Sequence, residues 1–447
     1  MTNLFSNTQA LRDEIVNLAN SEGLDKPYYK KMLDYTIELF ETQGLGTDYY
    51  GYHNIEHELE VTYITLLAAT RDRETFEIKE RDLEYLYTAS LFHDFDPQKS
   101  IDKPHEESVV QFISLDKELK RLLDEACLDI DIITVLILRT AYPWAGKLKE
   151  DSEKKIKECF KRSNITKNDE QKQEHFMNLG WFLSIVDRIS GYALGDFSKA
   201  LEMAKKNAHA LTWHPSLITQ RSVSYFEDLL NKESKICQNV LHSLPNEMRK
   251  NFMNSVLSFM RMREKEIKIT SECVFDRLKL VPCKDSIKTR EDNNFISKIF
   301  SIYDEMPKPL QLARIGFTDS VKNGETIFVT LRLNDNKGEI VGFAKGGPLE
   351  NYNLRKEISD ENFGQKNTIF LEPIVIKMGY WGFSGGSQLR DLFYKEAREK
   401  NFKFLTSFGL RDVIRERVSK ESAEFVTLFD PEHWDYYRVN LLKKFKN

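Results

Sequence analysis

Three histidines and two aspartates in the first half of the chain have the types and spacing to act together in one chemical site. His53 and His57 lie four residues apart and run into an apolar helical stretch, so both imidazoles can face one cavity. His93 and Asp94 are adjacent and follow an apolar helix, so they can meet one ion only where that helix ends or turns. Asp187 lies inside an apolar run, where its charge is costly unless a cation or a hydrogen-bonding partner compensates it.

The part of the chain that must position these side chains has the pattern of a helical domain. From about residue 10 to residue 268, apolar residues recur three and four positions apart between long Lys- and Glu-rich faces, as in amphipathic helices. The strongly charged stretch 145–174 is interpreted as a solvated helix or loop that joins two core helices. We therefore expect the five side chains to be carried by packed helices.

After about residue 271 the pattern changes to short strand-like runs, which predict a second domain. These runs cover residues 326–333, 339–344, 368–376, 402–407 and 424–429. The turn signal at 334–338 predicts that the first two form an antiparallel hairpin, and residues 387–400 predict a helix. The predicted fold class is multidomain, with an all-helical domain over residues 1–270, a linker over 271–292 and a mixed α/β domain over 293–447.

The composition is that of a globular protein, and it argues against several classes of partner. The 447 residues are 41% hydrophobic and 30% charged, with a net charge of −5, which does not favour a nucleic-acid partner. The five cysteines form no CxxC pair, as is typical of reduced thiols in a cytosolic protein. No apolar run reaches the roughly 20 residues needed to span a bilayer, so we expect a cytoplasmic protein without membrane association. The oligomeric state stays open, with a homo-oligomer among the alternatives.

The ordered set of His, His-Asp and Asp resembles the signature of the HD phosphohydrolase superfamily. The segment 52–57 looks like the YHNxxH motif of its cyclic-nucleotide phosphodiesterase branch, and the resemblance extends over about residues 29–230. It implies that one metal ion is bound by four side chains, those of His57, His93, Asp94 and Asp187. It also implies that His53 binds no metal and protonates the departing oxygen, so His53 and Asp94 are the predicted catalytic residues.

The chemistry implied by this resemblance is metal-assisted hydrolysis of a phosphoester. Mixed imidazole and carboxylate ligands suit Mn, Fe, Zn or Mg, and the sequence does not choose between them. Such a metal lowers the pKa of a bound water and polarises the phosphoryl group, while a histidine near its ordinary pKa can act as the general acid. The expected substrate is a cyclic nucleotide, or a related nucleotide or phosphoester.

One departure from the family pattern concerns a second metal ion. The phosphodiesterase branch usually reads HDxxHPG, whereas residues 93–98 contain neither a second histidine nor a glycine. His105 either replaces the missing ligand at a second metal or is a surface histidine before a helix. Asp96 either orients a ligand or caps the next turn.

Four further residues are candidates for substrate binding. Arg139 and Tyr142 occupy the place where HD enzymes often carry groups that contact substrate or metal, and Arg139 is suited to a phosphate. Alternatively, both residues only end a helix. Gln220 and Phe226 are spaced like a glutamine and an aromatic clamp for a purine, although both types are common in helices without such a role.

The C-terminal strand pattern, with the glycine-rich segment 379–389 followed by a helix over 390–398, resembles the GNAT-type N-acetyltransferase fold over about residues 293–441. The resemblance implies a loop whose backbone N–H groups hold the pyrophosphate of acetyl-CoA or another acyl-CoA, helped by the positive end of the helix. The residues predicted to form this loop are Gly382, Gly385, Gly386 and Ser387. The alternative is a glycine-rich bend that only turns a strand into a helix.

The match to this acyl-CoA loop is incomplete. Trp381 stands where the family pattern has glutamine or arginine, and Ser384 stands where it has a glycine. Binding of an acyl-CoA is therefore favoured over catalysis. If transfer occurs, the resemblance implies Glu372 as a base and Tyr436 or Tyr437 as an acid, and each of these is alternatively a structural residue.

Two main hypotheses of function follow from these patterns. In the first, the protein is a metal-dependent phosphohydrolase, most specifically a phosphodiesterase, whose C-terminal domain regulates it or binds acyl-CoA. In the alternative, the protein is an acyl-CoA-dependent N-acyltransferase or acyl-CoA sensor, and the N-terminal domain is a degenerate metal-binding scaffold. A third hypothesis, a pure interaction scaffold, predicts no tightly bound metal.

Overall fold

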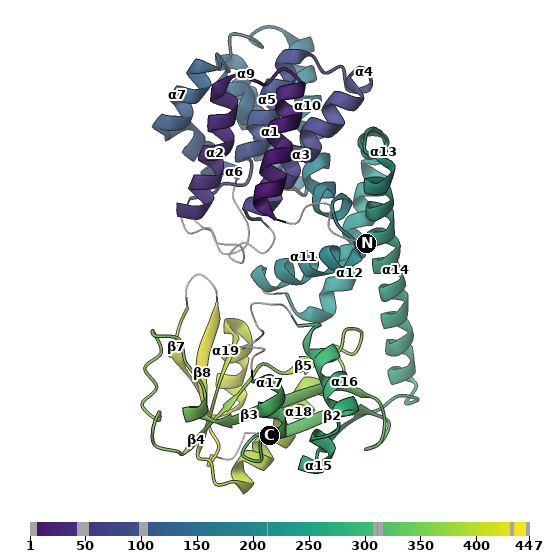
Figure 1. Cartoon of the computed structure of the whole chain (residues 1–447), viewed down its shortest axis with the longest axis vertical. Helices are drawn as coiled ribbons and strands as arrows, with labels where there is room; N and C mark the ends of the chain where they lie inside the picture. The colour runs from purple at the N-terminus through teal and green to yellow at the C-terminus, as the bar shows by residue number, and fades with distance from the viewer. Residues whose placement is uncertain are drawn as a thin grey trace. The chain divides into compact units, whose positions relative to one another are not determined.

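The computed structural model describes residues 7–42, 53–97, 106–211, 213–306, 311, 316–429 and 433–443. The chain divides into two compact units, Met1–Leu211 with Arg221–Met260, and Thr212–Gln220 with Arg261–Asn447. The first unit is helical, and the second is built around a mixed β-sheet (Figure 1). The predicted fold class, a helical part followed by a mixed α/β part, is confirmed.

The helical unit contains most of the helices of the chain. Its first ten are α1 Thr8–Ser21, α2 Pro27–Thr42, α3 Ile55–Arg71, α4 Arg73–Phe76, α5 Glu80–Phe92, α6 Glu106–Leu115, α7 Lys117–Glu125, α8 Ile130–Leu138, α9 Gly146–Arg162 and α10 Glu170–Ala193. Then follow α11 Phe197–Ala210, η1 Pro215–Leu217, α12 Ile218–Glu227, η2 Asp228–Lys232, α13 Ser234–Ser243 and α14 Asn246–Val274. Of these, η1 belongs to the second unit, while α12 and α14 each run across a boundary between the two units.

Burial patterns explain how these helices pack. Every residue of α8 from Ile132 to Leu138 is buried, as expected of a core helix that is apolar on all sides. In α9, which begins the charged stretch, only a narrow stripe is buried, so this helix covers the surface. Helices α3, α5 and α10 contact one another in all three pairs, and the candidate site lies among them. No helix in the described part of the chain is both long and apolar enough to cross a membrane.

The second unit contains one sheet and the helices that flank it. The strands are β1 Leu280–Lys284, β2 Ile327–Leu333, β3 Ile340–Pro348, β4 Thr368–Leu371, β5 Val375–Ile376, β6 Phe404–Leu410, β7 Ala423–Thr427 and β8 Trp434–Asn440. The remaining elements are α15 Ile287–Arg290, α16 Asn293–Tyr303, α17 Phe317–Lys322, η4 Leu349–Asn351, α18 Gly385–Glu399 and α19 Arg411–Lys420. The strand order is β1-β2-β3-β4-β6-β8-β7, with β5 paired to β3 alone.

All neighbouring strands are antiparallel except β4 and β6, which are parallel. The predicted hairpin between the first two strand runs is confirmed as β2 and β3. Its turn contains Asn334 with φ of +64°, a left-handed conformation that asparagine tolerates better than most residues. The predicted helix over 387–400 is α18, which begins two residues earlier.

Three parts of the second unit differ from the sequence predictions. The run 368–376 is split into β4 and β5, because Pro373 between them has no N–H to give to a ladder. The segment 271–292, expected to be a linker, contains the end of α14, the edge strand β1 and α15. Strand β8 was not predicted. It lies between β6 and β7 and is hydrogen-bonded to both.

Candidate metal centre

His57 is held at the start of α3 by the cap of that helix. The extended residue Asn54 accepts a hydrogen bond on its side chain from the backbone N–H of His57 at 3.1 Å, which satisfies one of the free N–H groups of the first turn. His53 lies before this cap, so α3 carries His57 and not His53. Their ring centroids are nevertheless only 5.8 Å apart, and both rings lie in the same region.

His93 and Asp94 lie where α5 ends. His93 is the C-terminal cap residue of this helix, with φ of −68° and ψ of −28°. Adjacent side chains inside a helix point about 100° apart, but after His93 the chain leaves the helix and both side chains can turn toward one region. The prediction that the helix ends at this pair is confirmed.

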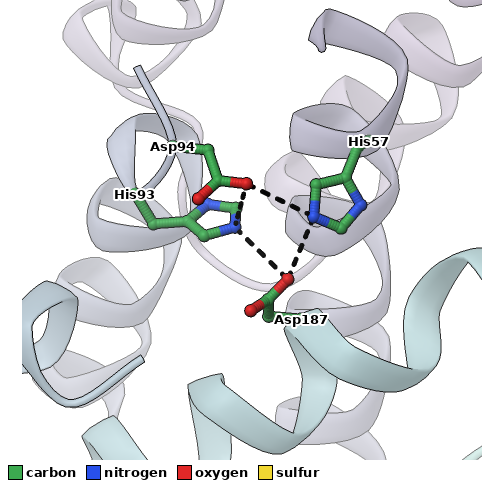
Figure 2. Close-up of side chains that lie close together, drawn as sticks. All are labelled: His57, His93, Asp94 and Asp187. Carbon is green, nitrogen blue, oxygen red and sulfur yellow. Dashed lines mark hydrogen bonds and ion pairs between the residues drawn. The ribbon is translucent and has the colours of Figure 1, made fainter. Parts of the chain in front are cut away.

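Asp187 projects from α10 among buried apolar neighbours, including Val186 and Ile189. It meets the two histidines and Asp94 at one point. Figure 2 shows the four side chains, from α3, the end of α5 and α10, pointing toward one another. The convergence of these four predicted residues is thus a property of the packing of three helices.

The facing atoms of the four side chains have the spacing of ligands to one ion. The Nε2 atom of His57 lies 2.9 Å from Oδ1 of Asp187 and 3.5 Å from Oδ2 of Asp94. The Nε2 atom of His93 lies 3.7 Å and 3.6 Å from the same two oxygens. Donor atoms that bind one ion at about 2.0–2.2 Å lie about 3–4 Å from one another. The spacing therefore fits a single cation among the four side chains.

The hydrogen bonding of these side chains also fits a cation. Nε2 of His93 and Oδ2 of Asp94 are buried, and neither has a hydrogen-bond partner among the described residues. Buried polar atoms in folded proteins are almost always satisfied, so two such atoms facing one point indicate a missing partner. Two imidazoles and two carboxylates form a donor set that suits Mn, Fe, Zn or Mg.

Electrostatics show how the site is balanced without a metal. Burial alone would lower the pKa of His57, but its hydrogen bond with Asp187 and the charges of Asp187 and Asp94 raise that pKa. The pKa of His93 is raised well above its ordinary value, because Asp94, Glu58 and Asp187 outweigh its burial. Burial would raise the pKa of Asp187, yet its hydrogen bond with His57 and the nearby charges of both histidines lower it. The two carboxylates thus favour positive charge on the imidazoles, as they would favour a cation among the four side chains.

Sequence reasoning missed one residue of this site, Glu58. Its side chain is fully buried, with Oε2 at 3.3 Å from Nδ1 of His93 and Oε1 accepting from the backbone N–H of Asp94 at 3.3 Å. The signal was present, because Glu58 is a charged residue in an apolar helical stretch, which is the same reasoning that singled out Asp187. Three glutamates alternate there, and Glu60 is buried as well, so only the packing shows which of them meets the His-Asp pair.

The predicted substrate residues Arg139 and Tyr142 lie in a different cluster. Arg139 caps the end of α8, and its guanidinium carbon lies 4.2 Å from the ring centroid of Trp144 and 5.4 Å from that of Trp181. Burial lowers the pKa of Arg139 to about 10. The hydroxyl of Tyr142 donates to Asp228 at 3.5 Å. Arg139 therefore fits the alternative interpretation, in which it ends a helix.

The structure describes three other predicted residues, Phe226, Gln220 and Asp96. Phe226 is 1% exposed in an aromatic core with Tyr192 and Phe252, so its ring has no free face for a purine. Gln220 is exposed and belongs to the second unit. Asp96 is buried and accepts a hydrogen bond from Ser108 of α6. His105 lies outside the described residues.

The predicted acyl-CoA loop leads into α18. Gly382 has φ of +88°, which glycine adopts without strain, and α18 begins at Gly385 with Ser384 as its cap residue. A Cβ at Gly385 would lie 2.6 Å from a methyl carbon of Leu331, so this glycine is required by packing. A Cβ at Gly386 would have no contact closer than 3.8 Å, and this position is open. The Ser387 hydroxyl donates back to the Ser384 carbonyl at 2.8 Å.

The residues proposed for acyl transfer are all engaged in structural contacts. Glu372 pairs with the ammonium of Lys345 and accepts from the Tyr352 hydroxyl at 2.9 Å. Tyr436 donates to Asp360 at 2.8 Å, and the Tyr437 hydroxyl is bonded to a guanidinium N–H of Arg417. These contacts favour the structural reading of each residue.

The chain thus has a helical unit, with two buried histidines and two partly buried aspartates suited to one cation, and a mixed α/β unit. No protein-family model matches the sequence, and no curated protein matches it. Among solved structures, the chain is similar to a GNAT-family acetyltransferase of Staphylococcus aureus Mu50, with 13% identity over 36% of this chain and 99% of that chain, and a TM-score of 0.26.

Two further solved structures are similar to this chain over a comparable share of its length. The ribosomal-protein-alanine N-acetyltransferase of Brucella melitensis is 14% identical over 36% of this chain and 99% of that chain, with a TM-score of 0.24. The yncA protein of Salmonella typhimurium, described as an acetyltransferase with its cofactor acetyl-CoA, is 11% identical over 38% of this chain and 98% of that chain, with a TM-score of 0.25. Similarities at this level do not assign an activity to this chain.

Proposed function

We propose that the helical unit is a metal-dependent phosphohydrolase, and more specifically a phosphodiesterase that acts on a cyclic nucleotide or a related nucleotide. The observation that carries the proposal is the meeting of His57, His93, Asp94 and Asp187 with their donor atoms within 4.8 Å of one another. The order of these residues in the chain, with the YHNxxH segment before His57, supports phosphoester hydrolysis over other metal chemistries.

In this proposal the residues of the chain divide the work between binding and proton transfer. The two imidazoles and two carboxylates would hold a divalent cation, which supplies a Lewis acid that activates water and polarises the phosphoryl group. His53 stands outside this set, with Nε2 at 3.9 Å from Oδ2 of Asp94 and a partly exposed side chain. An imidazole that lies beside the ligand set without belonging to it is suited to give a proton to the departing oxygen.

Chelation and restoration of metal test this proposal. Protein stripped with a chelator is expected to lose hydrolysis of cyclic nucleotides and other phosphodiesters, and addition of Mn²⁺, Fe²⁺, Zn²⁺ or Mg²⁺ one at a time is expected to restore it. Elemental analysis of the protein before stripping identifies the resident ion. A protein that hydrolyses none of these substrates with any of the four metals would contradict the proposal.

His53→Ala is expected to lower kcat for a nucleotide substrate by about 100-fold, the range of a positioned general acid, while the metal content stays unchanged. The deficit should shrink with a p-nitrophenyl phosphodiester, because that leaving group departs without protonation. His242→Ala, an exposed histidine on α13, serves as the matched control and should behave as wild type. An equal loss with both leaving groups would assign His53 another role.

A second candidate function, binding of an acyl-CoA, is favoured by the sheet of the second unit. The parallel pairing of β4 with β6 ends at Phe370 and Thr406. Beyond that point β5 pairs with β3 alone, while β6 continues beside β8 as far as Leu410. Strands β5 and β6 are therefore not hydrogen-bonded to each other. The glycine-rich loop follows β5 and opens α18, whose first N–H groups have no partners within the helix. Because Glu372 is paired with Lys345, these features support acyl-CoA binding or sensing more than N-acyl transfer.

Gly386→Asp is expected to weaken binding of acetyl-CoA to the full chain at least 10-fold, measured by calorimetry. The added carboxylate would repel a pyrophosphate at the first turn of α18 and would not destabilise the helix, since acidic residues are favourable there. Lys395→Gln, at an exposed position further along α18, is the matched control, because it also changes the net charge by −1. Absence of binding by the wild-type chain would remove this candidate.

A further inference from the structure

Glu58 is a buried carboxylate whose contacts all lead to the candidate metal ligands. Its side chain is 0% exposed. Glu58 follows His57 on α3, and its buried neighbours on that helix include the apolar residues Leu59 and Val61. Burial of a carboxylate is costly unless partners compensate it. If this position only filled the core, an apolar side chain would stabilise the helix packing more than a glutamate does.

The contacts of Glu58 reach from α3 to the end of α5. One oxygen, Oε1, accepts the backbone N–H of Asp94 at 3.3 Å. The other, Oε2, lies 3.3 Å from Nδ1 of His93. The same side chain therefore contacts both members of the His-Asp pair, at the point where the chain leaves α5 and no helical hydrogen bond holds it.

The surroundings of the His93 ring decide which nitrogen carries the proton. Nδ1 is hydrogen-bonded to the Ser90 carbonyl at 3.1 Å, and the charge of Glu58 lies beside it, with Oε2 at 3.3 Å but outside hydrogen-bond geometry, so this nitrogen is a donor. Nε2 faces Asp94 and Asp187. With its proton fixed on Nδ1, the neutral ring presents the lone pair of Nε2 to the cluster, which is the form that binds a metal.

We propose that Glu58 is a positioning residue of the metal centre: its carboxylate holds His93 in the tautomer and orientation that present Nε2, and it holds the backbone of Asp94 at the end of α5. The inference rests on the proposed metal centre, but it does not depend on which phosphoester is cleaved. It assigns to Glu58 no contact with metal or substrate.

Two substitutions separate positioning from simple filling of the core. In Glu58→Gln, the amide has one acceptor oxygen, whereas the Nδ1–H of His93 and the N–H of Asp94 are both donors, so one contact is lost. In Glu58→Met, both contacts are lost while the volume of the core is kept. For each variant we expect the affinity for Mn²⁺ to fall by about 10- to 100-fold, the usual cost of losing an outer partner of a ligand. The metal-free Glu58→Met protein is expected to stay folded but to lose some thermal stability, because the His93 ring and the Asp94 N–H no longer face the carboxylate.

The measurement is calorimetric titration of the metal-free full chain with Mn²⁺ at constant pH, together with thermal unfolding before metal is added. Glu60→Gln is the matched control, because Glu60 is also a buried glutamate on α3 and its carboxylate pairs with Lys199. The affinity of this variant for Mn²⁺ should equal that of wild type. Wild-type affinity in both Glu58 variants, or unfolding of both without metal, overturns the inference.

The titration also separates this inference from the proposed function. If the wild-type chain binds Mn²⁺ and Asp187→Asn does not, while both Glu58 variants bind normally, the metal centre stands and only the role of Glu58 is wrong. If the wild-type chain binds no Mn²⁺, or if Asp187→Asn binds it as wild type does, the metal centre itself is wrong and the inference falls with it.

Discussion

Asp187→Asn is expected to lower kcat/KM for metal-dependent phosphoester hydrolysis by about 10³-fold, since a catalytic metal supplies several kcal/mol of transition-state stabilisation. Asp187 is chosen because its Oδ1 lies within 3.7 Å of Nε2 of both His57 and His93. Asparagine keeps the size of the side chain and removes the charge that balances a cation. Steady-state kinetics, with elemental analysis of the same samples, should show activity and bound metal falling together.

The matched control for this variant is Asp124→Asn. Asp124 is an exposed aspartate near the end of α7, so the change of charge is the same and the site is untouched. Full activity in Asp187→Asn with normal metal content would show that the four side chains are not the metal centre. Full metal content with lost activity would instead place Asp187 in the chemistry rather than in binding.

The same variant has a second expected result, in the metal-free protein. The pKa of His57 and that of His93 are raised in the folded state, so the stability that their protons bring is present below about pH 6.5, the ordinary value, and is lost as the pH rises through the raised values. The pKa of Asp187 is lowered, so its contribution is present above about pH 4 and is lost in acid. Metal-free wild type should therefore exceed Asp187→Asn in stability most clearly at about pH 5–6.

Local signals singled out the five candidate side chains, and the resemblance to HD phosphohydrolases selected the four that meet in the cluster. Asp187 stands out as a charge in an apolar run, and a His-Asp pair after an apolar helix indicates a helix end, which the structure places at His93. The position of His53 had a readable signal too. Asn54 is a preferred N-cap residue, and it would have placed the start of α3 after His53.

Residues whose roles depend on distant partners could not be predicted in the same way. Glu58 meets His93 and Asp94 only because α3 packs on α5, and no local pattern distinguishes it from Glu60, which meets Lys199. Glu372 looks like an available base until Lys345 and Tyr352 are placed beside it. Strand β1 contains a proline, which lowers its strand signal, and its pairing with β2 is a long-range contact.

The second large effect concerns Arg188, the neighbour of Asp187 on α10. Its side chain is 4% exposed, and its two terminal nitrogens donate to the carboxylate of Glu233 at 2.6 and 2.7 Å. Glu233 also accepts from the indole N–H of Trp181 at 2.6 Å. Burial would raise the pKa of Glu233, but the hydrogen bonds and charge of Arg188 lower it, so the acid is ionised and balances the buried guanidinium.

Glu233→Ala is expected to destabilise the protein by about 3–5 kcal/mol, the cost of leaving one member of a buried ion pair alone. The effect should lie near the upper end of that range, because Arg139 nearby is also buried and its pKa is held up by the charge of Glu233. The midpoint of denaturant unfolding at constant slope measures the loss. Glu227→Ala, an exposed glutamate of α12, should change stability by less than about 0.5 kcal/mol.

A double variant separates the charge left behind from other effects of Glu233→Ala. In Glu233→Ala with Arg188→Met the unpaired guanidinium is gone, so part of the lost stability should return, and the non-additivity gives the coupling between the two residues. If the loss of unfolding free energy in the double variant equals the sum of the losses in the two single variants, the ion pair contributes nothing and packing alone holds this part of α10. Recovery of stability would mean that the loss in Glu233→Ala comes from the guanidinium of Arg188 left unpaired in the interior, one residue after Asp187 on α10.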